Sequence, residues 1–386
     1  MYNVKTFNAI AQEGLDEFRA NYQLNQTTDA DAFLIRSVDL HGYNFPQNLK
    51  AIVRCGAGFN NIPLDVATTN GTAVFNTPGS NANAVKELVV AMLIIASRNL
   101  FSAARYAAQN SGADISTRTE REKTQFNGTE LTGKTLAVIG VGHVGARVAT
   151  AAGALGMQVI GYDPYLSAND AWHIPTTTKR AASLEEALVN ADYVSVHVPK
   201  NSETTNMIST KEIALMPKET VLLNFARGGI VDNHAVCEAL DAGHLKRYMT
   251  DFGEPEILNR KDVLVTPHIG GSTLQAEANG AVQGADTIMT FLETGNVMHS
   301  VNLPSLEVPF ASKYRLTIMH QNIPNMVGQI ATLLATANVN IESMSNAARD
   351  KVAYSIIDTN NEFDFDDVVK KLEAIDAVYR VRLLKR

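Results

Sequence analysis

Short apolar runs alternate with helix-like segments through the first hundred or so residues of the chain. The runs lie over residues 5–10, 32–37, 51–55 and 73–76. Turn residues such as Pro46 and Pro63 separate them. Because strands that alternate with helices are typical of parallel sheets, this part of the chain predicts an α/β fold. The apolar stretch 83–100, which carries few charges, predicts a long buried helix.

A second block of strand signals begins after Gly133. Its strands are expected over residues 135–139, 158–162, 191–196, 221–224, 247–251 and 263–266. Helical segments separate them, over residues 144–155, 183–188, 210–216 and 233–242. Parallel strands need crossover connections of about a dozen residues, so this spacing predicts a doubly wound parallel sheet. A further helix is expected from residue 274 to about residue 293.

The C-terminal part of the chain shows a different order of elements. Pro304 and Pro309 mark a linker before it. Strands are expected over 314–320, 340–347, 353–359 and 378–384, and helices over 326–337 and 366–374. This β-α-β-β-α-β order is typical of a ferredoxin-like fold.

Composition narrows the class of protein. The 386 residues suffice for two or three domains, and 45% apolar with 19% charged residues is ordinary for a globular protein. Lys and Arg number 33 against 40 Asp and Glu, a net charge of −7, which argues against a nucleic-acid partner. Cys55 and Cys237 are too few for a disulfide framework or a four-thiolate metal site, so a reducing cytosol is expected. No metal is expected.

The N-terminus lacks the apolar core of a signal peptide. The longest apolar stretch, residues 88–96, is too short to cross a bilayer. We therefore expect a cytoplasmic protein without a membrane partner.

A dinucleotide-binding fingerprint follows the strand 135–139. Gly140, Gly142 and Gly145 form the pattern G-x-G-x-x-G directly before a helix. The first glycine permits a tight turn, the second lets a pyrophosphate approach the backbone, and the third allows close helix packing. Asp163 ends the next strand, where a carboxylate accepts hydrogen bonds from the adenine ribose and repels a 2′-phosphate. The pattern predicts NAD rather than NADP as cofactor.

Three later segments, 224–232, 250–256 and 266–272, follow strands of the same predicted sheet. Doubly wound sheets bind ligands at this carboxyl edge. Arg227 offers a planar fork for a carboxylate, and His268 offers an acid–base group. Hydride transfer from a 2-hydroxy acid requires both, because the acid must be held and its hydroxyl proton must be taken up.

These motifs resemble those of the D-isomer-specific 2-hydroxyacid dehydrogenases, and in particular the type that ends in an ACT domain. The resemblance includes Asn76-Thr77-Pro78, residues 128–136, the fingerprint, and the segments ARGGIVD and TPHIGGS. It implies that Arg227 binds the substrate carboxylate, that His268 exchanges the proton, and that Glu256 supports the histidine. Proline follows Glu254 here, whereas in the family it follows the catalytic glutamate, so Glu254 remains the second choice.

The resemblance also implies a set of contacts to NAD beyond the three glycines. By matching position they are made by Thr77, His143, Val144, Asp163, Val198, Phe225, Ala226, Asp251 and Gly270.

The substrate is expected to be a phosphorylated 2-hydroxy acid. The resemblance implies oxidation of 3-phospho-D-glycerate to 3-phosphohydroxypyruvate, the first step of serine synthesis. Arg54 and Gly56 lie in a loop that the resemblance makes substrate-binding, and a glycine backbone there could present N–H groups to an anion. Arg36 ends another predicted strand and is inferred from its position alone. Pairing with a surface acid is the alternative for Arg36.

Three residues of the C-terminal module match positions that bind L-serine in related ACT domains: His320, Asn322 and Asn340. The usual proline-glycine of the module is Pro324-Asn325 here. A module that serves only for assembly is the alternative to feedback control. Since edge strands of such sheets pair readily, a homodimer or homotetramer is expected in either case.

The expected fold class is therefore α/β with three domains. A flavodoxin-like substrate domain comprises residues 1–97 and 281–305, and a Rossmann-like NAD domain comprises 98–280. A linker, 306–313, leads to the ferredoxin-like ACT domain, 314–386. Two other functions stay open: another D-2-hydroxyacid dehydrogenase, of the glyoxylate/hydroxypyruvate or D-lactate type, and a non-catalytic NAD-sensing protein.

Overall fold

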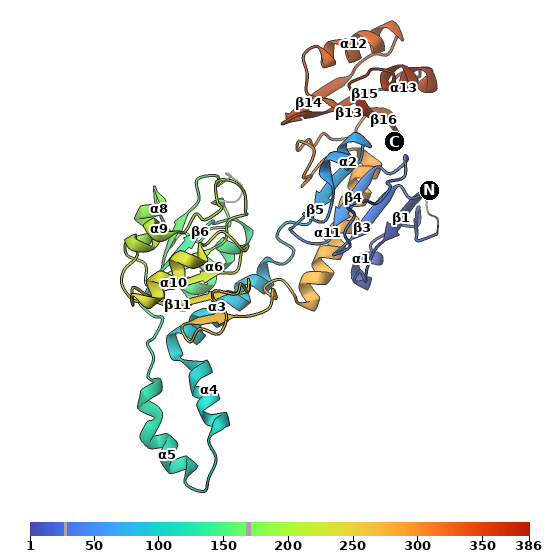
Figure 1. The fold of residues 1–386 in the computed structure, drawn as a ribbon. Helices are drawn as coiled ribbons and strands as arrows, with labels where there is room; N and C mark the ends of the chain where they lie inside the picture. Colours follow the sequence, from blue (N-terminus) through green and yellow to red (C-terminus); the bar gives the residue numbers. More distant parts are fainter. Residues whose placement is uncertain (27–28, 167–170) are drawn as a thin grey trace. The chain divides into compact units, whose positions relative to one another are not determined.

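The computed structural model describes residues 1–26, 29–166 and 171–386, which fold into two compact units (Figure 1). The first unit comprises Met1–Asn81 and Leu274–Arg386, and the second comprises Ala82–Thr273. The domain limits expected from the sequence, between residues 97 and 98 and between 280 and 281, stay predictions.

The first unit contains a five-stranded parallel sheet with the order β2-β1-β3-β4-β5. Its strands are β1 (Tyr2–Thr6), β2 (Tyr22–Leu24), β3 (Ala32–Ile35), β4 (Ala51–Arg54) and β5 (Ala73–Asn76). Helices α1 (Gln12–Leu15), α2 (Leu64–Thr69) and α11 (Leu274–Thr294) accompany it. This strand order is that of flavodoxin-like folds and confirms the expected class.

Each face of this sheet has its own apolar core. Val4, Leu34 and Phe75 pack with residues of α11, such as Ile288 and Phe291, on one face. The other face packs against α2 and the loops between β3 and β5. Strand β3 is buried along its whole length, which explains the continuous apolar run in its sequence.

The second unit contains a seven-stranded parallel sheet with the order β12-β11-β10-β9-β6-β7-β8. Its strands are β6 (Thr135–Ile139), β7 (Gln158–Tyr162), β8 (Lys179–Arg180), β9 (Tyr193–Val196), β10 (Thr220–Asn224), β11 (Leu245–Thr250) and β12 (Val263–Val265). The accompanying helices are α3 (Ala82–Arg98), α6 (His143–Ala154), α8 (Leu184–Leu188), α9 (Thr210–Leu215) and α10 (Asn233–Asp241). The strand order reverses at β6, so the dinucleotide loop that follows β6 lies at the switch point of a doubly wound sheet.

Helices cover both faces of this sheet. Alternate residues such as Leu136 and Val138 pack with α3 and α6 on one face. Ala137 and Ile139 face the other side, where α8, α9 and α10 lie. The alternation explains why the strands are apolar throughout.

A helical hairpin follows α3, formed by α4 (Leu100–Gln109), α5 (Ile115–Glu122) and the short 3₁₀ helix η1 (Lys123–Phe126). Figure 1 shows α4 and α5 extending away from the sheet of the same unit. Neither helix contains a buried residue. Among the described residues no single helix has the length and apolar character to cross a membrane, although α3 and α4, which meet at 68°, pass that test as a bent pair.

The C-terminal module has the expected β-α-β-β-α-β order. Its elements are β13 (Tyr314–Gln321), α12 (Met326–Thr336), β14 (Ser343–Arg349), β15 (Val352–Thr359), α13 (Phe365–Glu373) and β16 (Val378–Lys385). The antiparallel sheet has the order β14-β15-β13-β16, which is the ferredoxin-like arrangement. One face packs under α12 and α13.

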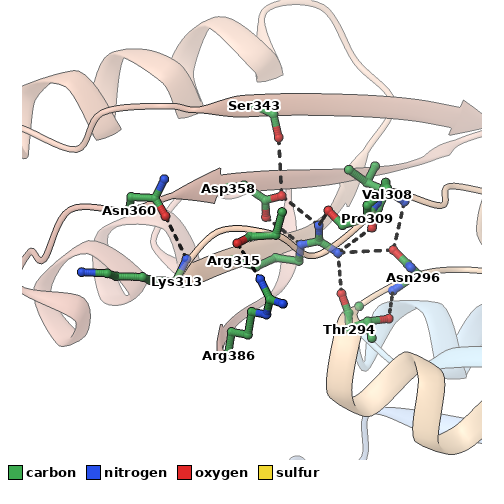
Figure 2. A network of polar contacts seen from close by, with 12 residues as sticks. Thr294, Asn296, Val308, Pro309, Lys313, Arg315, Ser343, Asp358, Asn360 and Arg386 are labelled. Carbon is green, nitrogen blue, oxygen red and sulfur yellow. Dashed lines mark hydrogen bonds and ion pairs between the residues drawn. The ribbon is translucent and has the colours of Figure 1, made fainter.

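The other face of this antiparallel sheet packs against the first sheet's core, through Met319, Tyr354 and Ile356. Arg315, which is fully buried, anchors the junction (Figure 2). Its guanidinium donates to both carboxylate oxygens of Asp358, at 2.7 and 2.8 Å. It also donates to carbonyl oxygens at the end of α11 and in the linker, those of Thr294, Val308 and Pro309.

Two further arginines of β16 bind the first sheet's connections. Arg382 is buried, donates to the carbonyl oxygens of Phe291 and Leu292, and stacks on the Phe291 ring at 4.5 Å. Arg380 donates to the carbonyl oxygens of Gln47, Asn70 and Gly71. The C-terminal module is therefore part of the same compact unit as the five-stranded sheet.

Some expected elements differ from the observed ones. The first strand, expected over residues 5–10, runs over Tyr2–Thr6, since Asn8 adopts a left-handed φ of 66° that ends extended structure. The edge strands β2 and β8 and the hairpin helices were not expected. Strand β8 has only two residues, and the hairpin helices lack a buried apolar stripe.

Candidate active site

The glycine-rich loop after β6 has the close contacts that its spacing predicts. Gly140 has φ 89°, and a Cβ there would lie 2.8 Å from the backbone carbon of His197. A Cβ on Gly145 would overlap the carbonyl oxygen of Gly140, so helix α6 can pack on the loop only with glycine there. Nothing lies within 4 Å of a Cβ built on Gly142, the N-cap of α6. Helix α6 begins at His143, so its first N–H groups lie at the end of the glycine loop, where a helix can bind an anion.

Asp163 follows β7 and lies beside this loop. One carboxylate oxygen accepts from the N–H of Val141 at 3.0 Å, and the other accepts from the N–H of Tyr165 at 3.0 Å. These two hydrogen bonds fix the carboxylate at the edge of the loop, where an adenine ribose is expected.

The turn after β10 carries Arg227. The buried side chain of Asn224 bridges the turn, accepting from the Ala226 N–H at 3.2 Å and donating to the Arg227 carbonyl at 2.9 Å. Phe225 is buried beneath the turn. The Arg227 guanidinium donates to the Ala226 carbonyl, and no carboxylate pairs with it among the described residues. Such a cation is suited to an anionic ligand.

Asp251 lies at the end of β11 and is buried. Its Oδ2 accepts from the Gly270 N–H at 2.9 Å, whereas its Oδ1 is buried without a hydrogen-bond partner among the described residues. Burial raises the pKa of this carboxyl, and the Gly270 N–H and the charge of His268 act against that rise. A buried acceptor without a partner is an expected site for a donor from a ligand.

His268 is exposed, and its ring lies 4.8 Å from the Phe252 ring. No hydrogen bond or ion pair joins it to Glu254 or Glu256 in the described part of the chain. The Glu256 carbonyl accepts from the Cys237 thiol at 3.6 Å. The charge of His268 acts on Asp251. The described residues do not form the histidine–glutamate pair that the sequence predicts, so the choice between the glutamates stays open.

His197, which directly follows strand β9, was not predicted from the sequence. His197 Nε2 shares a hydrogen bond with Ser195 Oγ at 2.9 Å, and its Nδ1 is buried without a partner among the described residues. Burial lowers the pKa of His197 to about 3, so the ring is neutral. Val198, a predicted NAD contact, follows it, and its Cγ1 would lie 2.9 Å from a Cβ on Gly140. The position of His197 after a predicted strand of the NAD-binding sheet could have indicated a residue close to the cofactor.

These features fit a dinucleotide. The glycine loop has room for a pyrophosphate, Asp163 is fixed beside it, and Asp251 Oδ1 lacks a donor among the described residues. Val144 packs in the core beside α3, and Ala226 offers its backbone in the Arg227 turn. Among the described residues no group of three or more His, Cys, Asp or Glu side chains is placed to hold a metal ion.

The remaining predicted ligand residues belong to the first unit. Arg54, at the end of β4, donates to the carbonyls of Arg36 at 3.0 Å and Gly58 at 2.9 Å. The Gly56 N–H donates to Thr77 Oγ1 at 2.6 Å, so this N–H is not offered to an anion as the sequence analysis expected. Arg36 follows β3 and forms an ion pair with Glu277 of α11.

The three predicted effector residues lie in different surroundings. His320 is buried, and its Nε2 contacts Ser355 Oγ at 3.1 Å. Asn322 and Asn340 are exposed, and they donate to the Asp350 carbonyl and to Glu342 respectively. Within the described part of the chain no hydrogen bond joins the three, so their common role stays a prediction. Asn325 adopts φ 69°, which asparagine tolerates in place of glycine, and its Oδ1 lies over Gly328.

A switch-point glycine loop together with an arginine after β10 and a histidine after β12 of the same sheet defines a nicotinamide-dependent dehydrogenase. Comparison with known proteins gives the family. Residues 90–270 match the family model described as "D-isomer specific 2-hydroxyacid dehydrogenase, NAD binding domain".

Curated relatives match over most of the chain. D-3-phosphoglycerate dehydrogenase of Escherichia coli K12 is 32% identical over 358 residues, covering 88% of this chain and 83% of the relative. D-3-phosphoglycerate dehydrogenase 1 of Saccharomyces cerevisiae is 30% identical over 395 residues, covering 94% and 80%.

Solved structures share the fold. The NAD⁺-bound 3-phosphoglycerate dehydrogenase of Entamoeba histolytica has a TM-score of 0.61 at 25% identity, covering 79% of this chain and 99% of that one. The apo D-mandelate dehydrogenase of Rhodotorula graminis has a TM-score of 0.65 at 22% identity, covering 80% and 99%. The chain belongs to the D-isomer specific 2-hydroxyacid dehydrogenase family. It is an NAD-dependent D-2-hydroxyacid dehydrogenase.

Proposed function

We propose that the chain oxidises 3-phospho-D-glycerate to 3-phosphohydroxypyruvate with NAD, the first step of L-serine synthesis. The observation that carries the proposal is the pair of arginines at neighbouring strand ends of the first unit, Arg36 after β3 and Arg54 at the end of β4. One cationic side chain can bind the carboxylate of a hydroxy acid. A phosphate group carries more negative charge and more acceptor oxygens, so further cationic side chains are expected around it. The names of the relatives from Escherichia coli and Saccharomyces cerevisiae support the same substrate.

The proposed mechanism assigns each group one task. Arg227 binds the substrate carboxylate through its planar fork. His268 accepts the C2 hydroxyl proton while the C2 hydrogen leaves as a hydride, so that the C2–O bond becomes a carbonyl. NAD, when bound, supplies the hydride acceptor. Thr77, the glycine loop and Asp163 are proposed to hold it, together with Asp251 through its free oxygen.

The glutamate that stabilises the charged imidazole is proposed to be Glu256, with Glu254 as second choice. A neighbouring carboxylate favours the protonated ring. Replacement of the supporting glutamate by glutamine should therefore displace the acid limb of the profile of kcat/KM against pH. A displaced profile in Glu254→Gln with an unchanged one in Glu256→Gln would reassign the role.

A second candidate is a D-2-hydroxyacid dehydrogenase for an unphosphorylated substrate, of the glyoxylate/hydroxypyruvate or D-lactate type. The ion pair between Arg36 and Glu277 favours it, since that pair compensates one of the two cations. A spectrophotometric NADH assay against a panel of 2-hydroxy and 2-keto acids separates the candidates. The highest kcat/KM is expected for 3-phospho-D-glycerate, and a preference for glyoxylate or D-lactate would establish the second candidate.

The C-terminal module is proposed to be an ACT domain that binds L-serine at His320, Asn322 and Asn340, in a cytoplasmic homodimer or homotetramer. In one chain His320 is closed off by Ser355 and Asn346. A site for serine would therefore need groups from a second copy or a rearrangement of β14. Calorimetric titration of L-serine into the full chain tests this, and no heat at millimolar serine would leave the module as an assembly device.

A further inference from the structure

Helix α11 is fixed by close contacts with the five-stranded sheet and with α1. A Cβ on Gly284 would lie 2.9 Å from Leu34 Cδ1 and 3.3 Å from Cys55 Sγ. A Cβ on Gly14 of α1 would overlap Ala281, one turn earlier in α11. The helix therefore approaches β3 and β4 as closely as its backbone allows, and the residues of its first turn have a determined position beside the ends of these strands.

One of these first-turn residues is Glu277, whose Oε1 pairs with Nη2 of Arg36. Both side chains are partly exposed, Arg36 at 38% and Glu277 at 34%. The Arg36 backbone is held as well, because its carbonyl accepts from Arg54 Nε at 3.0 Å. In the described part of the chain, Glu277 is the acceptor of the Arg36 guanidinium, whose remaining donors face no protein partner.

The charge of Glu277 acts where the proposed function needs positive charge. Arg36 lies beside Arg54, and the carboxylate of Glu277 compensates the positive charge of Arg36. An anionic ligand of Arg36 must either share the guanidinium with Glu277 or displace it. An ion pair that is open to solvent can be shared at moderate cost.

We propose that Glu277 is a specificity-determining residue, a built-in counter-ion of Arg36 that sets how strongly the enzyme prefers phosphorylated over unphosphorylated 2-hydroxy acids. The proposal rests on the proposed function, in which Arg36 binds the substrate phosphate. Glu277 weakens the binding of the phosphate without affecting the carboxylate end, which is assigned to Arg227.

The same helix provides a matched control. Glu293, in the last turn of α11, pairs with Arg19 in the same way, with Arg19 exposed at 60% and Glu293 at 25%. No residue assigned to substrate or cofactor contacts this second pair. Glu293→Gln therefore removes an equal charge from α11 without touching Arg36.

Steady-state kinetics of the full chain with 3-phospho-D-glycerate and with D-glycerate tests the proposal. Glu277→Gln should lower the KM for 3-phospho-D-glycerate about two- to fivefold, the range that partly exposed ion pairs give, with kcat unchanged. The KM for D-glycerate should stay constant, and the gain should shrink as ionic strength rises. Glu277→Asp and Glu293→Gln should behave like wild type. An unchanged or raised KM, or an equal change for both substrates, overturns the proposal.

Calorimetric titration with inorganic phosphate gives a reading that needs no turnover. Glu277→Gln should bind phosphate about two- to fivefold more tightly than wild type and Glu293→Gln. Equal affinity in all three overturns the proposal. If wild type binds phosphate in this way but does not oxidise 3-phospho-D-glycerate, the proposed function fails and the role of Glu277 stands. Thermal unfolding of each variant shows that the fold is kept.

Discussion

At the residue scale, two of the buried polar atoms without partners lie at strand ends of the seven-stranded sheet, one after β11 and one after β9. Asp251 Oδ1 and His197 Nδ1 have no hydrogen-bond partner among the described residues. A buried polar atom without a partner costs about 1–3 kcal/mol, so proteins rarely keep one unless a ligand or water completes it. The carboxyl edge of the sheet is thus destabilised in a way that a bound dinucleotide can relieve.

His268 should be required for turnover but not for stability. Because its side chain is exposed, His268→Ala should leave the free energy of unfolding within about 0.5 kcal/mol of wild type. Turnover should fall at least about a hundredfold, the usual contribution of a positioned acid–base group, while NADH binding is kept. Stopped-flow NADH formation and NADH fluorescence titration measure the two effects. Near-wild-type turnover would remove His268 from the mechanism.

Asp163 should decide between NAD and NADP. Asp163→Asn keeps an acceptor for the Val141 N–H but loses the negative charge. The KM for NAD should rise about tenfold, and the preference over NADP should fall by a similar factor, because hydrogen bonds to a charged group are the stronger ones. Glu203→Gln, which removes a charge that contacts Tyr165, is the control and should change neither value. Equal use of both cofactors by wild type would contradict this role.

His197 should make the protein less stable in acid. Burial lowers the pKa of its ring to about 3 from the usual 6.5, so between these values the unfolded chain binds a proton that the folded chain does not. Stability is therefore full above pH 6.5 and falls as the pH drops toward 3, by up to about 1.4 kcal/mol per pH unit. Urea unfolding at several pH values should show a shallower acid slope in His197→Asn than in wild type. The exposed His234 gives the control variant, His234→Asn, and equal slopes in all three would refute the assignment.

At the element scale, the sheet strands follow from their sequence because burial on both faces makes each strand a continuous apolar run. Strand β3 and the strands β6, β9 and β10 are of this kind. The helices α4 and α5 could not be found in this way, since none of their residues is buried. Strand β2 has only three residues and depends on its pairing with β1, a contact between distant parts of the chain.

Some residues of the candidate site could likewise be predicted from the local sequence, and others could not. The glycine loop, Asp163, Arg227 and His268 follow strands directly, so local spacing identifies them. Glu277 is 241 residues from Arg36 and meets it only because α11 packs against β3, which no local pattern encodes. The role of Asn224 was not predicted from the sequence. Its side chain bridges the Arg227 turn, and these hydrogen bonds depend on the conformation of that turn.

Arg382 should stabilise the fold by binding the C-terminal end of α11. Among the described residues, the partners of the buried Arg382 guanidinium are carbonyl oxygens and not a carboxylate. The negative end of the helix dipole compensates its charge. Arg382→Met should leave the carbonyls of Phe291 and Leu292 without donors and lower the free energy of unfolding by about 2–4 kcal/mol. Arg349→Met removes one exposed hydrogen bond and should cost less than about 1 kcal/mol, and equal losses in urea unfolding would contradict the account.

At the scale of the whole molecule, the C-terminal module is joined to the five-stranded sheet by a shared apolar core and three arginines. Met319 and Tyr354 pack with Phe75 and Phe291, and Arg315 binds the end of α11 (Figure 2). The same helix carries Glu277 in its first turn. A ligand that moved the antiparallel sheet would therefore also move α11. The first turn of this helix contacts Arg36, which is proposed to bind the substrate phosphate.

The central claim is that Arg227 binds the carboxylate of the substrate and that Arg36 binds its phosphate. The most direct test is kcat/KM of Arg36→Ala for 3-phospho-D-glycerate and for D-glycerate. The account predicts a loss of about ten- to hundredfold for the phosphorylated acid, the value of a charge-assisted hydrogen bond, and a change of less than about twofold for D-glycerate. An equal loss for both acids, or no loss for either, would contradict it.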